Sequence, residues 1–231
     1  MVRHDLVSSN PSLMTDLSLS EQAYGRLRRM IVRLDFAPGD VLREDALQET
    51  LGMSRTPIRE ALQRLAREHF VTVIPRRGMF VSGIDVSELS LLFETRTVLE
   101  PYAARLAAAR GTDEHWDAME AALGGVSAAD GNLDLMEIDR SGHEIMWEAA
   151  GNRFLVDTLD MLYAQSDRLW HLYLADVADM THAVDEHAEI MEALRGGDSD
   201  RAGDLMDAHI RAFDAQIRAA VTDRLSSPLA G

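Results

Sequence analysis

Three histidines and one aspartate in the second half of the chain could together bind a metal ion. Asp139 and His143 stand four positions apart in a helical segment, so both side chains project from one face, one turn apart. His187 and His209 lie in two later helical segments, each beside large apolar residues. Three imidazoles and one carboxylate suit Zn, Ni, Mn, Fe or Co and leave one or two coordination positions for water or a ligand. Taken singly, each histidine is also consistent with an ordinary core or surface residue.

A second group of residues could read DNA. The segment SRTPIREALQRL, residues 54–65, predicts a helix that begins with Thr56 as N-cap and Pro57 as first helical residue. Its apolar residues recur at spacings of three and four and predict one buried stripe, namely Ile58, Ala61, Leu62 and Leu65. The opposite face holds Thr56, Arg59, Glu60 and Gln63. Arg55 and Arg59 are the best candidates for guanine contacts, because a guanidinium can bond O6 and N7 together.

The segments around this helix predict a winged helix-turn-helix. Upstream, an amphipathic helix with Tyr24, Leu27, Ile31 and Leu34 ends at the Ala37-Pro38-Gly39-Asp40 turn. A short helix from Arg43 to Leu51, with Ala46, Leu47 and Leu51 inward, is separated from the recognition helix by the tight turn Gly52-Met53-Ser54.

Downstream, the apolar pattern switches to a period of two. Val71, Val73, Met79 and Val81 flank the tip Pro75-Arg76-Arg77-Gly78, which predicts a hairpin suited to phosphates or a minor groove. The complete set of predicted DNA-contacting residues is Arg43, Ser54, Arg55, Thr56, Arg59, Arg64, Arg76, Arg77 and Gly78.

In this order and spacing, the SRTPIREAL string, the Ala-Pro-Gly turn and the Arg-Arg-Gly wing resemble the GntR family of bacterial transcription regulators, over residues 20–82. Gln48 stands where a small residue is common, and His69-Phe70 replaces the usual Gly-Leu. Neither departure removes a predicted contact residue. The resemblance implies a partner, double-stranded operator DNA.

Charge divides the chain into two parts. The whole chain has a net charge of −16, yet residues 1–82 hold 12 Arg against 10 acidic residues, and residues 83–231 hold 11 Arg against 29. An asymmetry of this kind indicates two domains, with phosphate attraction confined to the first.

The chain has no cysteine, which excludes disulfides and thiolate metal sites. It also lacks an apolar run long enough for a membrane span or secretory signal, so we expect a soluble, cytoplasmic protein without membrane association.

After Ser82-Gly83 the sequence reads helical to its end, with breaks at Gly-rich turns. The expected fold is mainly α: an N-terminal winged helix-turn-helix domain plus a C-terminal all-α helical bundle. The expected organisation is a disordered segment at 1–17, the DNA-binding domain at 18–82, a helical effector-binding and dimerisation domain at 83–225, and a disordered tail at 226–231.

The second half resembles the FCD effector domain of the FadR subfamily of GntR regulators, over residues 86–222. The order Asp-x-x-x-His, then the histidine of EHAEIMEAL, then that of DAHI carries the resemblance, with ETRTVLEPYAARLAA at 94–108 and EAAGN at 148–152. It implies that Asp139, His143, His187 and His209 hold a divalent metal, zinc first and Ni, Mn, Fe or Co as alternatives. It also implies a small organic acid bound at or beside the metal.

Two residues of this half need separate comment. Arg96 matches a position that often meets the effector carboxylate, but it could also pair with Glu100 or Glu94 on its own helix. Gly142 stands before His143 where an aromatic residue is usual, which predicts a larger or looser pocket.

The sequence therefore predicts a metabolite-responsive transcriptional repressor, not an enzyme, that binds a short palindromic operator as a homodimer. Two half-sites require two copies, and the family pairs through its helical domain. A metal-dependent enzyme is the first alternative, because the same four residues could activate water. Against it, no His-Glu-x-x-His signature is present and the winged helix would be unexplained. In the second alternative the metal is structural or is itself the sensed signal.

Overall fold

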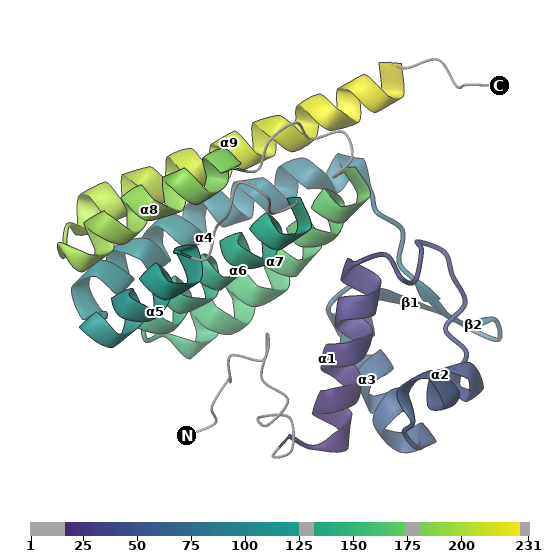
Figure 1. Ribbon diagram of the computed structural model, residues 1–231. Helices are drawn as coiled ribbons and strands as arrows, with labels where there is room; N and C mark the ends of the chain where they lie inside the picture. Colours follow the sequence, from purple (N-terminus) through teal and green to yellow (C-terminus); the bar gives the residue numbers. More distant parts are fainter. Residues whose placement is uncertain (1–16, 125–131, 174–180, 227–231) are drawn as a thin grey trace. The chain divides into compact units, whose positions relative to one another are not determined.

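The computed structural model describes residues 17–124, 132–173 and 181–226 (Figure 1). It separates into two compact units, the first ending at Ile84 and the second beginning at Asp85. Within the described residues, the first unit combines helices with a two-stranded sheet and the second is helical throughout. The predicted fold class is therefore confirmed. The two segments expected to be disordered lie outside the described residues, apart from Leu17 and Ser226.

The first helix, α1 (Leu19–Val32), supports the recognition helix α3 (Arg55–Arg67). A capping box starts α1: the backbone N–H of Glu21 donates to the Ser18 hydroxyl at 3.2 Å, and the N–H of Ser18 donates to the Glu21 carboxylate at 3.0 Å. Leu27 and Ile31 are fully buried against α3 as predicted. Leu34 lies past the helix end, half-buried and with a φ of 62°, so its assignment to the stripe was wrong.

The buried stripe of α3 is confirmed, since its four predicted residues are at most 1% exposed and the four on the opposite face are exposed. The predicted start was wrong, because α3 begins at Arg55 with Ser54 as its extended N-cap. Pro57 then occupies the third helical position. It is tolerated there because the N–H groups of a first turn have no acceptor within the helix.

Helix α2 (Glu44–Leu51) precedes α3 and ends at Gly52, whose φ of 66° is a conformation that favours glycine. Leu47 is buried as predicted, but Ala46 is exposed, so its inward assignment was wrong. Leu42 fills the core instead. Its N–H donates to the carbonyl of Met79 at 2.9 Å, which fixes the chain before α2 against the wing and turns Leu42 inward.

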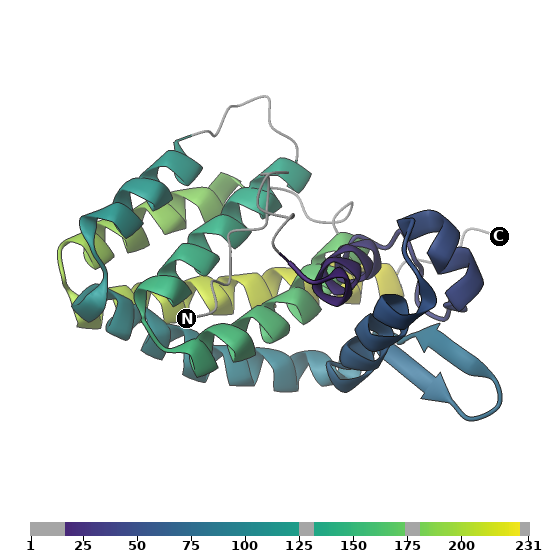
Figure 2. The same cartoon turned by 90° about the horizontal axis from the view of Figure 1, so that it is seen from below.

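The wing is an antiparallel hairpin of β1 (Val71–Ile74) and β2 (Gly78–Val81), with Val71 paired to Val81 and Ile74 to Gly78. Only its base is buried, since Val71 and Val81 are at most 3% exposed whereas Val73 is 53% exposed. The reason is visible in Figure 2, where the hairpin extends beyond the helices of its own unit. At the tip Arg76 has a φ of 64°, and the Arg77 N–H donates to the Ile74 carbonyl at 3.0 Å. This turn presents both arginines to solvent.

The second unit begins with a 3-10 turn at Val86–Glu88. Its helices are α4 (Leu89–Arg110), α5 (Asp113–Leu123), α6 (Asn132–Ala149), α7 (Arg153–Tyr173), α8 (Thr181–Arg195) and α9 (Ser199–Ser226). The bounds of these helices agree with the Gly-rich breaks in the sequence. None of the described helices is both long enough and apolar enough to cross a membrane.

Helix α4 is the centre of this unit, because it packs against α6, α7, α8 and α9 and runs beside α9 for much of its length (Figure 1). Its inward face is unusual: small alanines let the neighbouring helices approach, and two charged residues, Arg96 and Glu100, are buried among them. Its outward face carries the exposed apolar residues Leu91, Val98 and Tyr102. The helix is therefore apolar on two sides.

Candidate metal centre and nucleic-acid interface

The predicted metal ligands meet inside the helical unit. Asp139 and His143 come from α6, His187 from α8 and His209 from α9, and all four are at most 1% exposed. One potential ligand atom of each lies within 4.8 Å of the others. The Nε2 atoms of His143 and His209 are 3.3 Å apart, and the Nδ1 of His187 and the Nε2 of His209 lie 3.4 and 3.6 Å from the Oδ1 of Asp139.

These separations suit a divalent ion. Ligand atoms that each lie about 2.1 Å from one ion are about 3.0 to 3.4 Å apart, depending on the coordination geometry. The Oδ1 of Asp139 is moreover a buried carboxylate oxygen with no hydrogen-bond partner among the described residues. Leaving such an atom unsatisfied costs free energy, which a bound cation would recover. The donor set and its geometry therefore fit a metal ion.

Three further residues orient the ligands, and sequence reasoning missed this role for all of them. The Nδ1 of His209 donates to the Glu186 carboxylate at 2.7 Å, and the Nδ1 of His143 lies 2.7 Å from the Oε2 of Glu100. The Tyr163 hydroxyl donates to the Oδ2 of Asp139 at 2.6 Å. A carboxylate beside Nδ1 keeps the proton there and leaves Nε2 free to bind a metal.

The charge states follow from the same contacts. Burial alone would raise the pKa of Glu100, but the Arg96 cation, followed by His143, outweighs burial and holds the pKa at about 2. Burial would also raise the pKa of Asp139, and its three neighbouring imidazoles together with the Tyr163 hydroxyl lower it below its ordinary value. Burial, and then the Asp139 charge, raises the pKa of Tyr163. At neutral pH both carboxylates are anionic and Tyr163 remains a proton donor.

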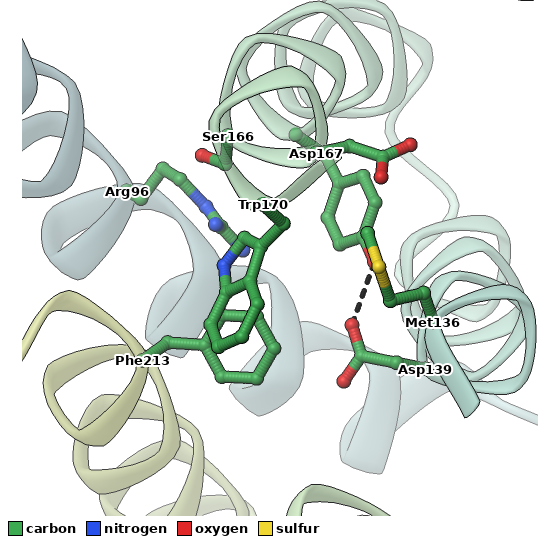
Figure 3. Close-up of a pocket in the computed structure, with 8 residues that line it drawn as sticks. Arg96, Met136, Asp139, Ser166, Asp167, Trp170 and Phe213 are labelled. Atoms are coloured by element: carbon green, nitrogen blue, oxygen red, sulfur yellow. Dashed lines mark hydrogen bonds between the residues drawn. The ribbon is translucent and has the colours of Figure 1, made fainter. Parts of the chain in front are cut away.

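A small cavity adjoins the cluster (Figure 3). Asp139 and Tyr163 belong to both the cluster and the cavity wall. The Nη1 of Arg96 and the Nε1 of Trp170 are buried without a hydrogen-bond partner among the described residues. The full lining is Arg96, Met136, Asp139, Tyr163, Ser166, Asp167, Trp170 and Phe213. The cavity therefore offers two unused donors next to the metal ligands.

Arg96 pairs with Glu100, which was one of the two expectations for it, and the effector contact stays a prediction. Its Nε donates to the Oε1 of Glu100 at 2.5 Å, and Arg96 is also one of the residues that line the cavity. The guanidinium also lies 5.2 Å from the centre of the Tyr163 ring. Glu100 therefore stands between a cavity residue, Arg96, and a metal ligand, His143.

Gly142 does not enlarge the pocket, so that expectation was wrong. A Cβ added at this position would lie 2.8 Å from the Cδ2 of His187, closer than real Cβ atoms approach other heavy atoms. The glycine instead makes room for the His187 ring against α6. The sequence could not show this, because the contact comes from another helix.

The predicted DNA-contacting residues are exposed, except for the half-buried Arg64. The guanidinium of Arg64 lies 3.7 Å from the centre of the Tyr24 ring and forms an ion pair with Glu68 at 3.0 Å. The Tyr24 hydroxyl donates to the same Glu68 at 2.7 Å. Arg64 therefore also ties α3 to α1. That these residues contact DNA stays a prediction.

Comparison with known proteins identifies the family. Residues 19–81 match the profile described as bacterial regulatory proteins, gntR family, and residues 91–212 match the FCD domain. The chain belongs to the GntR family. More closely, it is a DNA-binding regulator of the FadR-like subfamily, with an FCD domain following the helix-turn-helix.

Individual relatives agree with this assignment. The HTH-type transcriptional repressor RspR of Escherichia coli is 28% identical over 203 residues, which cover 87% of this chain and 89% of RspR. The Nta operon transcriptional regulator of Aminobacter aminovorans is 30% identical, over 84% of this chain and 94% of its own length. The E. coli McbR/YncC structure has the same fold, with a TM-score of 0.79 at 21% identity, covering 89% of this chain and 99% of that one. RspR and the Nta operon regulator are named as transcriptional regulators and not as enzymes, in agreement with the family assignment.

We predict that Gly142→Ala in this GntR regulator lowers its affinity for Zn²⁺ or Co²⁺ by about tenfold or more. The added methyl group must displace the buried His187 ring. Competition titration against a chelating dye measures the effect. Gly25→Ala is the control, because nothing lies within 4 Å of its new methyl group. Equal affinities for the two variants would show that His187 does not need this space.

The orienting role of Glu186 predicts that Glu186→Ala also weakens metal binding, by about tenfold. The variant removes the acceptor that keeps the His209 proton on Nδ1. Glu189→Ala removes an exposed carboxylate from the same helix, α8, and should leave the affinity unchanged. If both variants bind metal equally well, the contact between Glu186 and His209 has no part in the site.

Proposed function

We propose that this GntR-family regulator is a metabolite-responsive repressor. In this proposal residues 18–82 bind a short palindromic operator in the cytoplasm, and residues 83–225 form the homodimer and bind the effector. A small organic acid, bound next to a divalent metal, releases or re-sets the protein on DNA. Zinc is the first choice of metal, because the donor set is three imidazoles and a carboxylate.

One observation carries the proposal: the cavity beside the metal ligands contains unused hydrogen-bond donors. Arg96 supplies a positive guanidinium and Trp170 an indole N–H, both buried and both lining the cavity (Figure 3). Donors of this kind suit the oxygens of an anion, and a metal offers the same anion a further contact. The space is far below the roughly 300 to 1,000 Å³ of pockets for drug-sized ligands, so the proposal requires a small effector and movement of the lining side chains to admit it.

The direction of regulation is supported by RspR, which is named as a repressor. To act as a switch, the effector must bind one arrangement of the dimer better than the other. Helix α4 supports such a link, since it carries Arg96 and Glu100 on its inner face and exposed apolar residues on its outer face.

We predict that Arg96→Lys lowers the affinity for the anionic effector by about tenfold or more, because it removes the forked donors. Lysine keeps a cation beside Glu100, so the variant should still fold, whereas alanine would leave a buried carboxylate without that partner. The probe is a panel of small mono- and dicarboxylates, tested for binding by calorimetry and for release of DNA. If DNA binding follows free Zn²⁺ and responds to no carboxylate, the metal itself is the signal.

DNA recognition is assigned to the N-terminal end of α3 and to the tip of the wing. Arg55 and Arg59 are 64% and 62% exposed at the side chain, and we assign them base contacts. Ser54, Thr56 and Arg64 accompany them on or next to α3. Arg43, Arg76, Arg77 and Gly78 are assigned to the phosphate backbone or minor groove.

Two arginine variants should therefore have different effects on DNA binding. Arg59→Ala should cost about 1 to 3 kcal/mol on the operator and relax the preference at one base pair. Arg76→Ala should weaken all sequences alike and reduce the salt slope by about one. Binding titrations on operator and random duplexes at several salt concentrations measure both effects. An unchanged sequence preference in a folded Arg59→Ala protein would contradict the assigned reading face.

The homodimer is assigned to the outer face of α4. The large apolar side chains exposed in the described part of the second unit all lie on α4 or on its neighbour α7, namely Leu91, Val98, Tyr102 and Phe154. A helix that is apolar on two sides is expected to be covered on both. A second copy is the occupant that a palindromic operator requires.

We predict that Val98→Glu dissociates the dimer at micromolar concentration, because Val98 is 67% exposed in the single chain and would carry a charge into the interface. Sedimentation velocity measures the state, and operator affinity should fall with it. Ala121→Glu adds the same charge at an exposed position of α5 and should remain dimeric. A dimeric Val98→Glu protein would place the interface elsewhere.

A further inference from the structure

Glu44, the first residue of α2, lies between the two arginines of the reading helix. Its Oε2 is 3.3 Å from the Nε of Arg55, and its Oε1 is 3.9 Å from the Nε of Arg59. One carboxylate thus uses its two oxygens for two guanidinium groups one turn apart on α3. The side chain of Glu44 is 29% exposed, so it is more deeply placed than either arginine.

These contacts leave the outer ends of the guanidinium groups available. In both ion pairs the atom that approaches Glu44 is Nε, at the inner end of the group. The two Nη groups form the outer end. This end has the forked geometry that matches the O6 and N7 of guanine.

The position of the carboxylate has a cost for DNA binding. An anion on the DNA-facing side repels phosphates and weakens attraction to every sequence. Exposed ion pairs add little to folding stability. Glu44 instead restricts two long side chains before DNA binds, so these side chains lose less rotamer entropy on binding.

We infer that Glu44 is a positioning residue for sequence readout. It orients Arg55 and Arg59 toward base edges. It thereby lowers the affinity for DNA of any sequence and increases the discrimination between bases. This inference rests on the proposed reading face of α3.

The test is selection of bound DNA from a randomised duplex library by the full chain, in parallel for wild type, Glu44→Gln and Asp45→Asn. Asp45 is the matched control: it is exposed, lies in the same first turn of α2 and forms no ion pair with Arg55 or Arg59 among the described contacts. Both variants remove one negative charge and should bind a random duplex about twofold tighter. Only Glu44→Gln should lose preference at the guanine positions, by about twofold to tenfold per base pair.

Glu44→Asp separates charge from reach, because it keeps the anion but shortens the side chain. It should bind a random duplex like the wild type and still lose preference at the same guanines. If Glu44→Gln and Asp45→Asn select the same motif as the wild type with equal strength, Glu44 acts only as a charge and the inference is overturned. The proposed reading face fails separately, if Arg55→Ala and Arg59→Ala leave the selected motif unchanged.

Discussion

The buried carboxylate of Asp139 is the constraint on which the helical unit depends. A charged group with 1% of its surface exposed is costly unless it is paired, and its Oδ1 has no hydrogen-bond partner among the described residues. Three imidazoles face it, and Tyr163 satisfies its other oxygen. With Glu100 behind His143, residues of α4, α6, α7, α8 and α9 all take part. A cation at this point would hold these five helices together.

Helix α4 links this centre to the surface. Its inner side carries Arg96, which lines the cavity, and Glu100, which lies beside a metal ligand. Its outer side carries Val98 and Tyr102, which are exposed in the single chain. Because the two sides belong to one helix, a displacement of that helix at the cavity is also a displacement of the outer surface. This is the physical basis on which an effector could alter the spacing of two DNA-binding units.

The sequence predicted the features that depend on the spacing of residues along the chain. The stripe of α3 follows from a spacing of three and four, and the buried cluster of Asp139, His143, His187 and His209 follows from spacing together with family resemblance. Side-chain burial decided by tertiary packing was not predictable. Val98 is one of the apolar residues of α4, yet it is exposed, while Arg96 and Glu100 are buried because each neutralises the other. Gly142 was misread for the same reason, since its meaning depends on a ring from α8.

The most direct test of this account is the metal content and thermal stability of the full chain, purified without chelator or affinity-column metal and then supplied with trace divalent ions. The account predicts one ion per chain, and a stabilisation of about 4 kcal/mol at a free metal concentration a thousandfold above the Kd. His187→Ala should lose both, because the remaining ligands no longer include α8. Absence of stoichiometric binding, or equal binding by His187→Ala, would contradict the claim that these four residues form a metal site.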